Sequence, residues 1–313
     1  MAGPTSIEWA EQSWNPIVGC SITSPGCTNC YAMKMAHRLQ AMADKPRWTK
    51  KGVGTSHYVG TTKVVNGKAV WTGKLALAPE HVLLAPLRRK KPTTYFVNSM
   101  GDLFHEDCPD EWIDRVFAIM ALAPQHTFQV LTKRAARMRA YFLAQRQGKI
   151  SLAHDTMGIP FFEWPLPNCW LGVSAEDQKR ADERIPHLLA TPAAVRFLSV
   201  EPLLGLIDLH RVREDTGFTF DALSRKRGIS FRGVGLDQVI AGDESGPNRR
   251  TCNLDWVRAL RDQCVAAGTP FFLKQLHLDG RKVSLPVLDG RQHNGMPTGF
   301  LGRSAALTEG EGA

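Results

Sequence analysis

The sequence lacks the features that would direct the chain into or across a membrane. The first residues, "MAGPTSIEWAEQSW", are polar and aromatic instead of a basic start with an apolar run, and no later stretch is apolar for long enough to span a bilayer. No internal repeat is visible either. We therefore expect a cytoplasmic protein with no membrane partner, folded from a chain of 313 residues that is 43% hydrophobic.

Cysteine is scarce, and its distribution argues against a disulfide framework. Seven cysteines are an odd number in a chain without a secretion signal, so clustered thiols are better interpreted as ligands or catalysts. Four of them are scattered and predicted to be packing residues: Cys108, Cys169, Cys252 and Cys264. The other three, Cys20, Cys27 and Cys30, lie in one short segment, "GCSITSPGCTNCYA", residues 19 to 32.

Positive charge is in excess. A net charge of +9 and a pI near 9.3 favour a polyanionic partner. The basic runs are residues 88 to 91, residues 225 to 227, and Arg249 with Arg250. We slightly favour the interpretation that they are solvated surface. The alternative is a nucleic-acid interface, in which Trp48, Tyr58 and Trp71 stack on bases.

Short apolar runs alternate with amphipathic stretches from residue 94 onward. The predicted strands are 94–102, 127–134, 169–177, 195–202, 237–245 and 270–275, and a seventh is "SIEW", residues 6 to 9. The predicted helices are 32–43, 110–123, 134–147, 176–189 and 254–267. Alternation of this kind implies parallel strands with right-handed crossovers. We predict a full or partial (β/α) barrel of about six to seven parallel strands, with an open doubly wound sheet as the alternative.

Two insertions and a tail interrupt this pattern. The stretch from 58 to 73 alternates around Asn66-Gly67, which predicts a β-hairpin within an insertion at about 55–75. A basic insertion is expected at about 210–236. The sequence thus predicts one domain over residues 1–300 and a disordered tail over 301–313.

Polar residues follow the predicted strands, where the chemistry of such barrels sits. Capping of the next helix is an alternative for most of them, and Glu176 is interpreted as a first-turn helix residue. Capping does not explain Glu201, which precedes Pro202, or Lys274, which ends an apolar run. These two are assigned to a site. The other strand-end candidates are Asn98, Ser99, Asp102, Lys133 and Arg134.

Three interpretations compete for the cysteine segment. A structural zinc site needs a fourth ligand, which His37 could supply. A redox dithiol of Cys27 and Cys30 leaves Cys20 unexplained. An iron–sulfur cluster held by three thiolates would keep one iron open. Spacing alone makes zinc and cluster nearly equal, and the barrel context favours the cluster.

The segment resembles a variant of the cysteine motif of radical S-adenosylmethionine (radical SAM) enzymes. Their common spacing is three residues and then two, whereas six and two separate the cysteines here, and Tyr31 follows the last one. The whole chain, from about residue 7 to 300, resembles a phage- and bacterium-associated family of three-Cys-motif proteins without an assigned function. The matching segments include "IEWAEQSWNPIVGCSITSPGCTNCYA", "FVNSMGDLFHEDCPDEW", "VRFLSVEPLLG" and "PFFLKQ". Asp243 replaces a glycine of that family, and His293 a tryptophan.

The radical SAM resemblance implies a chemistry and a set of site residues. It implies a 4Fe-4S cluster on Cys20, Cys27 and Cys30, and S-adenosyl-L-methionine (SAM) as the second cofactor, cleaved to a 5′-deoxyadenosyl radical. It also implies roles for strand-end residues: Asn98, Ser99 and Asp102 at the SAM amino group, Lys133 or Arg134 at its carboxylate, and Glu201 and Lys274 in catalysis.

The substrate and the partners are also expectations. The resemblance and the basic charge together suggest a nucleic-acid substrate, with DNA repair or base modification as the reaction. An electron donor protein and a partner protein encoded nearby are expected as well. The alternative function is a zinc-stabilised nucleic-acid-binding protein without catalysis.

Overall fold

The computed structural model describes residues 2–5, 7–43, 54–144, 164–226, 228–246 and 248–297. Four features predicted from the sequence fall outside these residues: the ring of Trp48, the end of the basic run at Arg227, the last residues of the helix predicted to reach Gln147, and the tail over 301–313.

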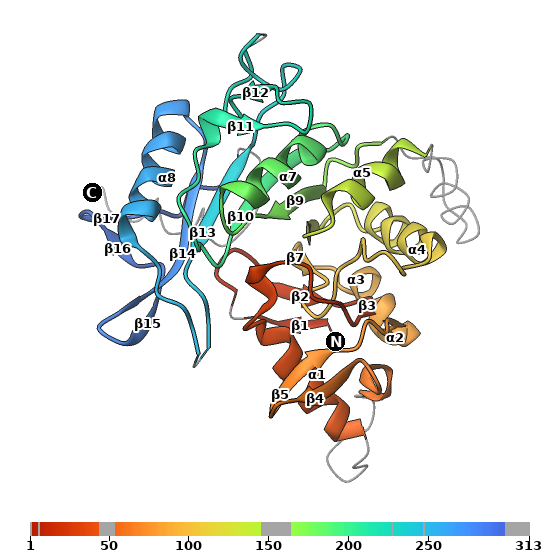
Figure 1. The fold of residues 1–313 in the computed structure, drawn as a ribbon. Helices are drawn as coiled ribbons and strands as arrows, with labels where there is room; N and C mark the ends of the chain where they lie inside the picture. The colour runs from red at the N-terminus through yellow and green to blue at the C-terminus, as the bar shows by residue number, and fades with distance from the viewer. Residues whose placement is uncertain are drawn as a thin grey trace, which may run out of the picture.

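The centre of the molecule is one nine-stranded sheet that curls into a half-barrel (Figure 1). Its order is β1-β2-β7-β8-β9-β10-β13-β14-β15, and the edge strands β1 (Ala2–Pro4) and β15 (Arg281–Ser284) are antiparallel to their neighbours. The seven strands between them are parallel: β2 (Gln12–Trp14), β7 (Thr94–Val97), β8 (Thr127–Thr132), β9 (Cys169–Ser174), β10 (Val195–Val200), β13 (Gln238–Gly242) and β14 (Phe271–Leu278). A mixed α/β fold with a mainly parallel sheet, compatible with a partial barrel, is therefore confirmed.

Four long helices connect the parallel strands and lie along the outer side of the sheet (Figure 1). They are α4 (Asp110–Ala121), α5 (Ala135–Leu143), α7 (Gln178–Leu189) and α8 (Leu254–Ala267). The main hydrophobic core includes alternate strand residues such as Val97, Val130 and Leu198 together with helix residues. Helix α7 begins two residues later than predicted, because Asp177 is its N-cap and accepts a hydrogen bond from the Arg180 backbone N–H.

The other face of the strands fills the inside of the half-barrel with rings. Trp9, Phe96, Phe197 and Phe272 belong to this second cluster, and the Trp9 and Phe96 centroids are 4.7 Å apart. The prediction of a strand at "SIEW" is wrong, since residues 7 to 10 turn and the first parallel strand is Gln12–Trp14. The turn brings Trp9 under the strand ends instead of into the sheet.

Apart from strands β1 and β2 of the central sheet, the described residues before residue 94 form a lobe that includes the cysteine segment (Figure 1). It contains β3 (Ile17–Val18), η1 (Pro25–Cys27), α1 (Tyr31–Ala43), η3 (Ser56–Tyr58), β4 (Thr62–Val65), β5 (Lys68–Trp71), β6 (Ala76–Leu77), α2 (Glu80–Leu83) and α3 (Ala85–Arg88). The hairpin β4–β5 is confirmed, with Asn66 and Gly67 at φ 47° and 71° as a primed turn requires.

Tyr58 and Trp71 pack under helix α1 and do not face solvent. Their exposed fractions are 0% and 6%, and both belong to a hydrophobic cluster with α1 residues such as Met33 and Leu39. Tyr58, which is fully buried, is therefore not available to stack on bases. Trp71 also lines the pocket described below, so its stacking on a base stays a prediction.

The remaining elements are short. They are η4 (Leu209–Arg211), β11 (Val212–Arg213), β12 (Thr219–Phe220), β16 (Val287–Leu288) and β17 (Arg291–Gln292). In the part of the chain that the structure describes, no helix has both the length and the apolar character needed to cross a membrane.

Candidate functional site

A pocket of about 210 Å³ lies where the parallel strands end. Trp9, Phe96 and Leu131 line its apolar part. The structure brings all ten residues predicted for the site to the wall of this one pocket: Cys20, Cys27, Cys30, Asn98, Ser99, Asp102, Lys133, Arg134, Glu201 and Lys274. They come from segments as far apart as the first loop and the last parallel strand, so only the fold could unite them.

The three thiols of the cysteine loop, residues 19 to 32, influence one another electrostatically. Burial raises the pKa of Cys20 to about 12, with smaller contributions from Asp102, Cys30 and Cys27 and an opposing one from Arg134. Burial also raises the pKa of Cys30, to which Cys27 adds. A thiolate in such a place needs a compensating cation, either a basic side chain or a metal.

Arg134, which follows strand β8, links the segment around Cys20 to the end of that strand through hydrogen bonds. Its Nη1 donates to Asp102 Oδ2 at 3.0 Å and lies 3.6 Å from Cys20 Sγ. Its Nη2 donates to Ser21 Oγ at 2.7 Å, and its Nε to Glu106 Oε2 at 2.8 Å. All three guanidinium nitrogens are therefore engaged by the protein.

Asp102 is engaged in the same way. It accepts hydrogen bonds from Thr132 Oγ1 at 2.6 Å, from the Lys133 backbone N–H at 3.0 Å and from the Phe104 backbone N–H at 3.0 Å. Together with its ion pair to Arg134, these contacts make Asp102 a support for the loop.

Glu176 ties the middle of the loop. Its carboxylate is fully buried, pairs with Lys133 and with Arg184 at 3.2 Å, and accepts a hydrogen bond from Ser24 Oγ at 2.7 Å. Burial acts to raise the pKa of Glu176, but the two cations outweigh it and hold the pKa below its usual value. A Cβ on Gly26 would lie 2.2 Å from Glu176 Oε1, so the loop can approach this closely only as glycine.

The interpretation of Glu176 as a first-turn helix residue is therefore wrong, since it precedes the helix and is fully buried. A signal was present in the sequence: a carboxylate at the end of a buried strand, with a basic residue at the end of the neighbouring strand and another, Arg184, in the second turn of the next helix.

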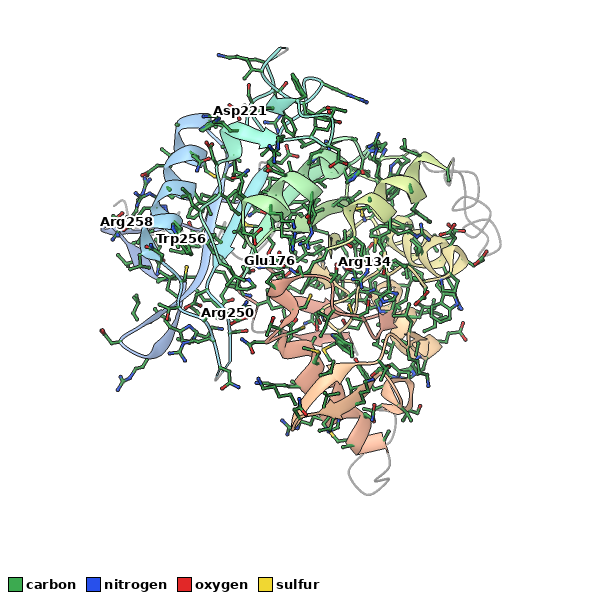
Figure 2. All side chains as sticks on the ribbon, viewed as in Figure 1. Arg134, Glu176, Asp221, Arg250, Trp256 and Arg258 are labelled. Atoms are coloured by element: carbon green, nitrogen blue, oxygen red, sulfur yellow. The ribbon has the colours of Figure 1, made fainter. Side chains whose placement is uncertain are left out.

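The segment after β13 forms hydrogen bonds with Pro25 and Asn29 of the cysteine loop. Glu244 pairs with Arg250, whose Nη2 donates to the Pro25 carbonyl at 3.0 Å. Asn29, between the last two cysteines, donates to Glu244 Oε2 and to the Asn248 carbonyl, both at 2.9 Å. Figure 2 shows Arg134, Glu176 and Arg250 around the N-terminal segment drawn in red. Arg250, interpreted from the sequence as part of a solvated basic run, is a structural contact.

Asn98 and Ser99 follow strand β7. Asn98 has φ 59°, a left-handed conformation that asparagine tolerates, and its Oδ1 accepts a hydrogen bond from the Ile17 backbone N–H at 3.4 Å. Its Nδ2 is buried without a partner among the described residues. Ser99 Oγ donates to Asn15 Oδ1 at 3.1 Å. Asn98 thus leaves a hydrogen-bond donor available at the pocket.

Glu201 and Lys274 are in contact with each other in the lining of the pocket. Lys274 Nζ lies 3.1 Å from Glu201 Oε1, although they come from strands separated by β13. Gly242 on β13 makes the approach possible, because a Cβ there would lie 2.7 Å from Glu201 Oε1. The two residues that capping could not explain are therefore an ion pair.

A site for one metal ion is not formed by the described residues, in which no three His, Cys, Asp or Glu side chains come close enough to bind the same ion. His37, considered as a fourth zinc ligand, has its Nδ1 3.3 Å from Thr62 Oγ1 of the hairpin. His105 is the histidine next to the loop, with Nε2 2.9 Å from Ser21 Oγ.

Fold and site define an α/β half-barrel protein whose three-cysteine loop is anchored over the carboxyl ends of the parallel strands. The chain belongs to the family described as protein of unknown function (DUF5131), whose model matches residues 4–297. No curated protein and no solved structure matches it.

Proposed function

We propose that the chain is a radical SAM-like iron–sulfur enzyme that holds a 4Fe-4S cluster on Cys20, Cys27 and Cys30 and leaves one iron open for SAM. The observation that carries the proposal is the shared pocket: three thiols of one loop line the same cavity as the strand-end residues of a mainly parallel half-barrel. In such folds the carboxyl ends of the strands carry the chemistry.

The donor set fits a cluster. Ligands of a single zinc ion must sit on one tetrahedron, which the described side chains do not form. Ligands of a cluster bind different irons, so they lie farther apart while remaining in one loop. All three thiols line the same pocket, as ligands of one cluster must.

Each part of the chain then has a task. Arg134, Glu176 and Arg250 hold the loop in place through contacts that start from three different strand ends. The Arg134 guanidinium at 3.6 Å from Cys20 Sγ favours the thiolate form of that ligand. A cluster held there and reduced by an electron donor protein would supply the one electron that cleaves SAM into methionine and a 5′-deoxyadenosyl radical. Trp9 and Phe96 keep water away from the apolar part of the pocket.

The strand-end residues divide into two groups in this proposal. Asp102, Lys133 and Arg134 support the loop, because their charges are already paired. Asn98 and Ser99 lie on the cofactor side, where the free Nδ2 of Asn98 suits an acceptor such as the SAM carboxylate. Glu201 and Lys274 serve the substrate and its proton transfers.

The test is the metal and sulfide content of protein purified without oxygen, with visible absorbance and electron paramagnetic resonance recorded before and after SAM is added. We expect iron, sulfide and a spectrum that SAM changes. Replacing Cys27 by alanine should remove the iron, whereas Cys252→Ala, a matched change outside the loop, should retain it. Zinc alone, without a response to SAM, would support the alternative of a zinc-stabilised nucleic-acid-binding protein.

The nucleic-acid substrate is part of the proposal and is supported by the net charge of +9. The ring of Tyr58 gives it no support, since it is fully buried, whereas Trp71 lines the pocket. The pocket itself supplies a more specific argument.

A further inference from the structure

The lining of the pocket combines apolar side chains, which we call the floor, with charged side chains, which we call the wall. Ile7, Trp9, Phe96 and Leu131 form the floor, and Glu201, Asp243 and Lys274 stand on the wall. We call these last three residues the strand side of the pocket. A floor of this kind fits the face of a planar ring, and the wall then meets the edge of that ring.

Asp243 has one oxygen engaged and one free. Its Oδ2 accepts hydrogen bonds from the His277 backbone N–H at 2.6 Å and from His277 Nδ1 at 2.5 Å. Its Oδ1 has no hydrogen-bond partner among the described residues. Water does not replace the missing partner easily, because the residue is only 5% exposed. A buried carboxylate oxygen without a donor is unfavourable, so a ligand that supplies a donor is favoured there.

Glu201 offers a second acceptor. Its Oε1 lies 3.1 Å from Lys274 Nζ as an ion pair but makes no hydrogen bond within the described part of the chain. Its Oε2 is 3.4 Å from Ser199 Oγ. Two residues of the pocket wall therefore each contain a buried acceptor oxygen that makes no hydrogen bond within the described part of the chain.

We infer that the strand side binds a nucleobase that carries an exocyclic amine, with Asp243 as the residue that selects it. This inference rests on the proposed nucleic-acid substrate and names the chemistry by which that substrate is chosen. Carboxylates accept hydrogen bonds from the exocyclic amine of cytosine, and an unstacked base is read at its edge while its face lies on apolar side chains. Uracil has a carbonyl at that position, which would face the lone pairs of Asp243 and Glu201.

Substitution by asparagine inverts the preference in a defined way. In Asp243→Asn the two His277 donors retain the amide oxygen at the Oδ2 position. The amide NH₂ must then occupy the place of Oδ1 and become a donor, which suits the uracil carbonyl and not the cytosine amine.

The experiment compares the binding of single-stranded oligodeoxycytidine and oligodeoxyuridine, each of about eight nucleotides, to the anaerobically purified protein. The two probes have equal charge, and neither contains adenine, so binding of the adenosyl cofactor does not confuse the result. We expect a preference of about tenfold for oligodeoxycytidine in the wild type. We expect that preference to vanish or reverse in Asp243→Asn.

Controls keep the test decisive. Asp262→Asn makes the same chemical change on an exposed side chain of α8 and should retain the wild-type preference. Glu201→Gln should reduce the preference, and it decides the matter if Asp243→Asn fails to fold. Equal binding of both probes by the wild type, no binding of either, or an unchanged preference in the folded Asp243→Asn protein would overturn the inference. Iron content is measured on the same samples. A protein without iron would contradict the proposed cluster, whereas the oligonucleotide preference tests the inference about Asp243.

Discussion

The two sides of the pocket use their polar groups in opposite ways. On the loop side, which we define as Arg134, Glu176 and Arg250 with their partners, charged groups are paired and hydrogen-bonded to the cysteine loop. On the strand side, Asp243 and Glu201 each have an oxygen without a hydrogen bond among the residues described. Satisfied groups fix a geometry, whereas unsatisfied buried groups call for a ligand. In the function that we propose, the loop side therefore positions the cysteines and the strand side recognises the substrate.

The largest expected effect comes from Glu176→Ala on the loop side. It leaves Lys133 and Arg184 without their shared carboxylate, so we expect the free energy of unfolding to fall by about 3–5 kcal/mol. Urea denaturation of the protein without its metal measures this change. Glu106→Ala, which removes a carboxylate that is 63% exposed, should lower it by about 1 kcal/mol or less. An equal fall in the free energy of unfolding for the two variants would contradict the interpretation that Glu176 anchors the loop.

Arg250→Ala tests the anchor at the end of the loop. It removes the contacts to Pro25 and Glu244, so we expect metal affinity to fall by about 10–100-fold with little change in folding stability. Iron retained during incubation with a chelator is the measurement. Arg249→Ala is the matched control, because Arg249 Nη2 donates to the Gly280 carbonyl at 3.4 Å instead of to the cysteine loop. Parallel iron loss from both variants would argue against a specific anchor.

Salt dependence tests the partner that the charge predicts. If the strand side receives a base while basic residues contact phosphates, affinity for a single-stranded oligonucleotide should fall by about tenfold or more between 50 and 200 mM salt. Fluorescence anisotropy with a labelled oligonucleotide gives the slope. A flat dependence would point to a small-molecule or protein substrate, and the recognition role of the strand side would need another ligand.

Local patterns were enough to predict most of the fold. Five of the six apolar runs from residue 94 onward contain a parallel strand, and the sixth, 270–275, covers the first part of β14 (Phe271–Leu278). The helix Leu254–Ala267 has the predicted bounds. Strand-end position also identified seven of the residues that line the pocket, and the clustering of cysteines identified three more. All of these follow from periodicity and chain order, which a sequence displays directly.

Pairing could not be predicted, because it joins residues that are distant in the sequence. Ser24 and Glu176 are 152 residues apart, and Pro25 and Arg250 are 225 apart. Lys133 and Arg134 were expected to bind the carboxylate of a cofactor. In the folded chain Lys133 pairs with Glu176 and Arg134 with Asp102, and the sequence alone could not show these ion pairs. Tyr58 was misjudged likewise, because helix α1 covers it only once the lobe has formed.

The smallest expected effect belongs to Lys274→Met, and it separates the two sides most clearly. The Lys274 and Glu201 side chains remain 17% and 13% exposed, so water shares in their solvation and methionine retains much of the packing volume. We expect the free energy of unfolding to change by about 1 kcal/mol or less and iron retention to match the wild type, while oligonucleotide binding changes. If this variant loses iron as readily as Arg250→Ala, the strand side also holds the loop, and the division between positioning and recognition does not stand.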